Sequence, residues 1–182
     1  MYDKKIMKNL LSVSKKLIFP ISLILILSFS RLIPHPWNFS PILAAGIFSG
    51  FYFRKFFLGS IIVILSMFIG DVFLGFHDTM LFTYISMLVA VALGLLISKF
   101  NFFQILITGI TSSICFFIIT NFGSWLTLEM YEKNLSGLVQ SYILAIPFFH
   151  NTILSTLLYL VVLKLLFEIA PRKIRQELTL FR

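Results

Sequence analysis

Long apolar runs separated by short polar links make up most of this chain. A helix needs about 20 mostly apolar residues to cross a bilayer. Six runs reach or approach that length and predict helices over residues 17–33, 39–53, 56–75, 80–98, 102–122 and 148–169. A further apolar stretch, 138–146, ends at Pro147; it is too short to span and is expected at the interface or folded back into the protein. The pattern predicts an all-α polytopic membrane protein of one domain with six transmembrane helices.

Composition supports this class. The chain is 59% hydrophobic and 12% charged, about half the charged share of a typical soluble domain. No G-x-S-x-G, H-E-x-x-H, Walker motif or pair of membrane aspartates is present, so we expect no enzyme and no cofactor. The net charge of +8 comes without a soluble basic face, and we therefore expect no nucleic-acid partner.

The positive charge instead indicates membrane orientation. Basic residues collect on the cytoplasmic side of membrane proteins. With both termini cytoplasmic, only Arg31 and Lys133 of the 15 basic residues lie outside. The outer segments are then "RLIPHPWNFSP" (31–41), "GDVFLGFHDT" (70–79) and the stretch from "TNFGSW" to "PFFHN" (120–151).

Both ends of the chain allow additional interpretations. The basic start, the apolar run and "SFS" at 28–30 resemble a cleavable signal peptide, although an uncleaved first helix fits the even helix count. The basic C-terminal tail "APRKIRQELTLFR" is expected to rest on the anionic inner leaflet.

The first outer link, "RLIPHPWNFSP", concentrates rigid and polar residues. Three prolines stiffen it, while His35, Trp37 and Asn38 supply an imidazole, a flat aromatic surface and an amide. Such a cluster can hold a small polar ligand. The alternative is a tight turn with Trp37 as an interfacial anchor.

The other outer links add polar groups at the same side. A carboxylate within an apolar helix usually faces a polar cavity or a partner. We therefore expect Asp71 to point into the bundle and accept hydrogen bonds from Asn121, Trp125 or the first outer link; the alternative is a hydrated helix cap. The candidate ligand-binding residues are His35, Trp37, Asn38, Asp71, His77, Asn121, Trp125, His150 and Asn151. The histidines lack helix-pair spacing and Cys115 is not grouped with them, so we expect no metal site and a packing role for the cysteine.

Small residues recur at four-residue spacing in the second apolar run. Ala45 and Ser49 form one row, and Gly46 and Gly50 form another. Such rows allow helices to approach closely, either within the bundle or against a partner protein.

Several of these motifs together resemble a known family. "RLIPHPWNFSPILAAGIFSG", Gly70–Asp71, "FFIITNFGSW" and "GLVQSYILAIPFFHNTIL" are similar to DUF6580, an uncharacterised family of bacterial membrane proteins related to the substrate-binding S components of energy-coupling factor (ECF) vitamin transporters. The resemblance covers about residues 17–168. It implies a six-helix bundle of the ECF S-component type in the bacterial inner membrane, an outer ligand pocket, and a small-residue face that meets a transmembrane coupling subunit with its ATPases.

The leading hypothesis is a membrane subunit that captures a vitamin-like micronutrient outside. No site residue matches a biotin, riboflavin or thiamine site, so the ligand stays open. The alternative is a non-transporting scaffold subunit of a membrane complex, similar to the cell-shape protein MreD.

Overall fold

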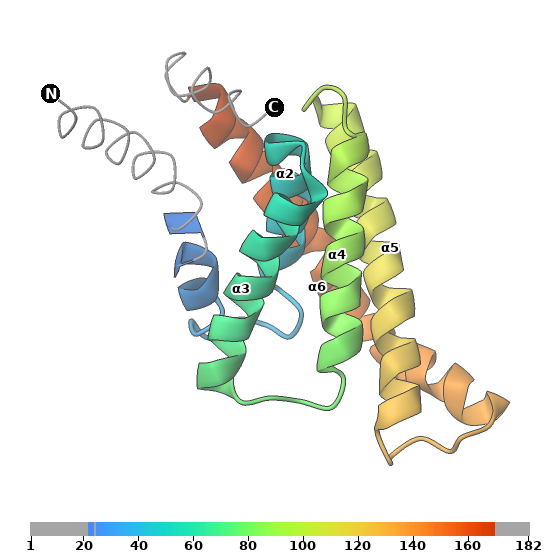
Figure 1. Ribbon diagram of the computed structural model, residues 1–182. Helices are drawn as coiled ribbons and strands as arrows, with labels where there is room; N and C mark the ends of the chain where they lie inside the picture. Colours follow the sequence, from blue (N-terminus) through green and yellow to red (C-terminus); the bar gives the residue numbers. More distant parts are fainter. Residues whose placement is uncertain (1–21, 24, 170–182) are drawn as a thin grey trace, which may run out of the picture.

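The computed structural model describes residues 22, 23 and 25–169, and these residues contain helices and connections but no strand. Helical residues 22–23 and 25–30 precede five helices: α2 (Ile42–Phe53), α3 (Phe56–Leu74), α4 (Met80–Leu96), α5 (Phe102–Thr127) and α6 (Leu135–Ile169) (Figure 1). The predicted all-α class is confirmed. The start of the predicted helix 17–33, and the C-terminal tail from residue 170, lie outside the described residues.

Within the described part of the chain, three helices are long and apolar enough to cross a membrane: α3, α5 and α6. The apolar helices α2 and α4 are shorter, with 12 and 17 residues. Helix α5 continues five residues beyond the predicted end at 122. In this extension, Ser124 and Thr127 donate their hydroxyls to the carbonyls of Thr120 and Gly123 within the helix, at 3.0 and 2.9 Å.

The prediction that Pro147 ends a separate interfacial stretch is wrong. Helix α6 runs through Pro147, although a proline cannot donate to the carbonyl four residues earlier. The part of α6 that precedes Pro147 packs on α5: the Ser141 and Tyr142 hydroxyls donate to the carbonyls of Asn121 and Ile118, at 3.2 and 3.0 Å. These contacts with a neighbouring helix hold that part in place, which sequence periodicity does not reveal.

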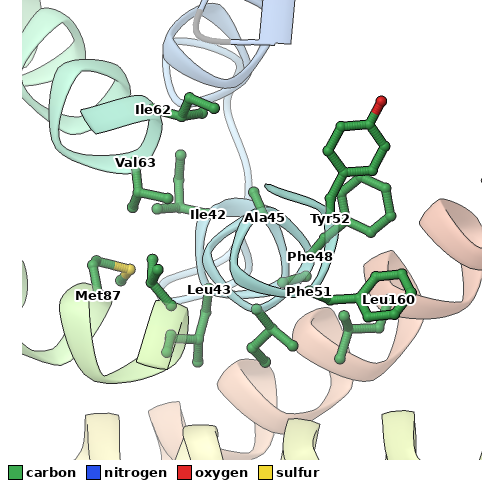
Figure 2. Packing of buried hydrophobic residues seen from close by; sticks show 14 of the residues in the cluster. Ile42, Leu43, Ala45, Phe48, Phe51, Tyr52, Ile62, Val63, Met87 and Leu160 are labelled. Atoms are coloured by element: carbon green, nitrogen blue, oxygen red, sulfur yellow. The ribbon is translucent and has the colours of Figure 1, made fainter. Parts of the chain in front are cut away.

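Helix α2 forms the centre of the molecule. All 12 of its residues are buried, and it contacts α3, α4, α5 and α6. Figure 2 shows it end-on, with Ile62 and Val63 of α3, Met87 of α4 and Leu160 of α6 around it. An element buried on all sides must be apolar all round, which explains why its sequence shows no polar face.

The connections divide the bundle into two ends. We call the end formed by connections 31–41, 75–79 and 128–134 the polar end. The opposite end, the basic end, carries the α2–α3 turn, the α4–α5 connection and the C-terminal part of α6 (Figure 1). Arg54 ties the basic end together: its guanidinium donates to the carbonyls of Leu95 and Ser98, at 3.0 and 3.3 Å.

Candidate functional site

The connection 31–41 lies within the height of the bundle instead of capping its edge. In Figure 1 it (light blue) sits farther up than the connection 75–79. A helix of 12 residues spans about 18 Å, less than the about 30 Å of a hydrocarbon core. Helix α2 is thus too short to cross a bilayer alone.

Side chains of α6 hold this connection in place. Asn151 donates to the carbonyl of Trp37 at 2.9 Å, and the Ser155 hydroxyl donates to the carbonyl of Asn38 at 3.3 Å. A turn closed by the Phe39 amide and the Pro36 carbonyl precedes α2. Asn38 adopts a φ of 60° in this turn, a left-handed conformation that asparagine tolerates better than most residues.

A buried ion pair links the start of the connection to α3. The Arg31 guanidinium lies 2.6 Å from Asp71 Oδ1, and it also donates to the Met67 carbonyl at 2.7 Å. The Tyr84 hydroxyl of α4 donates to Asp71 Oδ2 at 2.7 Å. Asp71 is 0% exposed, so its carboxylate is compensated by two donors from two other parts of the fold.

Gly70 makes room for this ion pair. A Cβ at that position would overlap the Arg31 guanidinium. The guanidinium therefore lies close to the α3 backbone at Gly70, beside Asp71. The Gly70–Asp71 dipeptide supplies both the space and the countercharge for Arg31.

Two adjoining cavities open beside the ion pair. The inner cavity has a volume of about 200 Å³ and the outer one about 430 Å³. Both are lined by Arg31, Asn38, Met67, Thr83, Phe116 and Thr152. The inner cavity also reaches the first residues of α2 and the hydroxyl-bearing Ser155 and Thr156 of α6. Among the described residues, no Asp or Glu side chain lines either cavity.

Five of the nine predicted ligand-binding residues line these cavities. His35 and Asn38 line the inner one; Trp37, Asn38, His77 and Asn121 line the outer one. Trp37 is 80% exposed, and its ring offers an aromatic surface at the mouth. The structure brings these side chains together from the connections 31–41 and 75–79 and from α5.

The other four predicted ligand-binding residues have different surroundings. Asp71 is buried, as predicted, and Arg31 of the first outer link donates to it, which confirms one of the three expected partners; the second donor is Tyr84, not Asn121 or Trp125. Asn151 positions the connection 31–41. The Trp125 indole donates to the Glu132 carbonyl at 2.9 Å, and His150 is exposed on α6. Neither Trp125 nor His150 lines a cavity.

The small residues of α2 make contacts inside the bundle. A Cβ at Gly50 would overlap the Val91 carbonyl of α4, and a Cβ at Gly46 would lie 3.2 Å from Ala90 Cβ. Ser49 donates to the Gly59 carbonyl of α3 at 3.3 Å, and Ala45 is 1% exposed. Close approach of α3 and α4 thus occupies Gly46, Ser49 and Gly50, whereas Ala45 lines an apolar cavity of about 430 Å³ between α2, α6 and residues 23–30.

Sequence reasoning missed several residues of this site. Arg31, Tyr84, Ser155 and Thr156 were not among its candidates. One signal in the sequence points to Arg31. The Asp71 carboxylate in an apolar helix needs a partner, and charge placement leaves only Arg31 and Lys133 as basic residues on the outer side. The Ser and Thr residues carry no such signal, because hydroxyls in apolar helices are satisfied by the carbonyl three or four residues earlier.

Together, the fold and these contacts define a class: an all-helical protein with helices suited to a bilayer and a polar cavity beside a buried ion pair. The chain belongs to DUF6580, a family of unknown function whose model matches residues 12–178. Comparison with curated proteins and with solved structures gave no match.

Proposed function

We propose that this protein is a substrate-binding membrane subunit, similar to ECF S components, that captures a vitamin-like micronutrient at the outer face of the bacterial inner membrane. The paired cavities at the polar end carry this proposal. Their walls combine hydroxyl, amide and imidazole groups with Met and Phe side chains, a mixture typical of small-molecule sites. A purely scaffolding subunit needs no such cavity.

The distribution of charge supports outer capture. Of the described basic residues, Arg54, Lys55, Lys99 and Lys164 belong to the basic end, and only Arg31 and Lys133 belong to the polar end. The positive-inside tendency places the basic end in the cytoplasm and the cavities outside. In this proposal the chain forms a six-helix bundle with cytoplasmic termini. It relies on a separate coupling subunit and ATPases for transport.

Ligand binding to the purified, full-length protein tests the proposal. We expect at least one member of a vitamin panel to raise its thermal unfolding temperature, or to co-purify and be found by mass spectrometry. A ligand present at 100 times its dissociation constant stabilises the folded state by about 2.7 kcal/mol. No shift and no bound molecule across the panel would contradict the proposal.

A matched pair of variants locates the site. Thr83 lines both cavities, whereas Thr127 lines neither, yet both hydroxyls donate to the carbonyl four residues earlier. Thr83→Met should reduce the ligand-induced shift by filling the cavity, and Thr127→Met should leave it unchanged. Equal shifts in both variants would place binding elsewhere.

A further inference from the structure

The inner cavity meets the N-terminus of α2. Ser40, Ile42 and Leu43 line it, and the N-cap residue Pro41 supplies no side-chain cap. The first amides of a helix have no acceptor within the helix and carry partial positive charge. By contrast, α5 begins with Asn101, whose side chain accepts from the Gln104 amide. The start of α2 therefore presents uncapped donors at the cavity wall.

The buried ion pair is oriented toward the same space. Arg31 lines the inner cavity, while Asp71 does not and is 0% exposed. The cavity thus meets the positive member of the pair, with the negative member behind it. A guanidinium has five N–H donors, and the bonds to Met67 and Asp71 leave others for a ligand.

A buried hydroxyl provides an independent sign of a missing partner. Thr156 lines the inner cavity and is 0% exposed. Its Oγ1 has no hydrogen-bond partner among the residues that the structure describes. Buried polar groups in native proteins are nearly always hydrogen-bonded, so this hydroxyl fits a group that enters the cavity.

We propose that the captured ligand carries a carboxylate, which binds in the inner cavity between the α2 N-terminus, Arg31 and Thr156. This inference rests on the proposed uptake function and specifies its substrate class. A monoanionic carboxylate suits the site better than a dianionic phosphate, because the charge of the Arg31 guanidinium is already paired with Asp71. The remainder of the ligand extends into the outer cavity, past Phe116 toward Trp37.

Matched acid and amide or alcohol pairs test the carboxylate directly. The probes are nicotinate and nicotinamide, biotin and biotinamide, and pantothenate and panthenol, titrated into the full-length protein by calorimetry. We expect the acid of a bound pair to bind at least about tenfold more tightly than its neutral counterpart, since charge-assisted hydrogen bonds are the stronger ones. Equal or tighter binding of the neutral member would overturn the carboxylate inference and leave the uptake proposal standing. No binding of any member would overturn both.

Two hydroxyl variants distinguish a ligand contact from a general effect on folding. Thr156→Val removes the proposed contact and keeps the side-chain shape; we expect it to weaken binding of the acid about fivefold to tenfold without lowering the unfolding temperature. Ser112→Ala removes another buried hydroxyl that has no partner among the described residues and lines neither cavity, so the affinity should stay unchanged. Unchanged affinity in Thr156→Val, or an equal loss in Ser112→Ala, would contradict the assignment of Thr156.

Discussion

At the scale of single residues, Asp71 and Arg31 decide how the polar end is held. Both are largely shielded, with side-chain exposures of 0% and 14%. Removing one partner of a buried pair leaves an uncompensated charge, which is much less favourable than replacing both. The ion pair connects residues 40 positions apart in sequence, so its loss also releases the connection 31–41 from α3.

We therefore predict strong coupling between these two positions. Asp71→Asn and Arg31→Gln should each lower the free energy of unfolding by about 3 kcal/mol. The double variant should recover a large part of the loss, because two neutral side chains of similar shape can hydrogen-bond. Equilibrium unfolding in detergent measures all four proteins of this cycle. Additive losses in the double variant would show that the pair is not energetically coupled.

The sequence reveals one half of this arrangement. Asp71 stands out because a carboxylate in an apolar helix requires compensation, and its burial follows from that argument. The first outer link follows as one possible partner, but the choice of Arg31 within it and the second donor, Tyr84, depend on how the connection 31–41 folds back against α3. Likewise, His35 and Asn38 are visible as polar residues in a rigid link, whereas Thr156 looks like any threonine in an apolar helix until its surroundings are known.

At the scale of helices, the contact between α2 and α4 depends on glycine at defined positions. A Cβ at Gly50 would overlap backbone of α4, whereas a Cβ at Gly46 would lie 3.2 Å from Ala90 Cβ and at an ordinary contact distance of 3.5 Å from the Met87 carbonyl. We predict that Gly50→Ala lowers the free energy of unfolding by about 1–3 kcal/mol, as overpacking in cores does. Gly46→Ala, one turn away, should change it by less than about 1 kcal/mol, since alanine's higher helix propensity offsets a small shift. Thermal or denaturant unfolding measures the free energy of unfolding of both variants. Equal losses in the two variants would mean that α2 and α4 separate easily.

Helix positions follow from apolar periodicity more reliably than helix ends do. The predicted starts at 56, 80 and 102 agree with α3, α4 and α5, because each follows a clear polar link. The predicted end of α5 at 122 and the predicted stop at Pro147 are misjudged, and packing of Ser141 and Tyr142 against α5 sustains α6 through Pro147. These contacts join residues that are distant in the sequence. Residue type alone does not reveal which of them pair.

At the scale of the whole molecule, the two ends of the bundle differ in charge and in chemistry. Arg54, Lys55 and Lys99 lie in the connections of the basic end, and Lys164 lies in the last turns of α6. The cavities open at the other end. Because the capture proposal requires those cavities to face outward, membrane orientation tests it without knowledge of the ligand.

We predict that the polar end is extracytoplasmic. In a Cys115→Ser background, single cysteines at Trp37 and Glu129 should react with a membrane-impermeant maleimide in intact cells, because both positions are exposed in connections of the polar end. A cysteine at Lys99, exposed in the α4–α5 connection, should react only after the membrane is permeabilised. The opposite pattern would place the cavities in the cytoplasm. Capture from outside would then be impossible, while the contacts among Arg31, Asp71 and Tyr84 would stand as described.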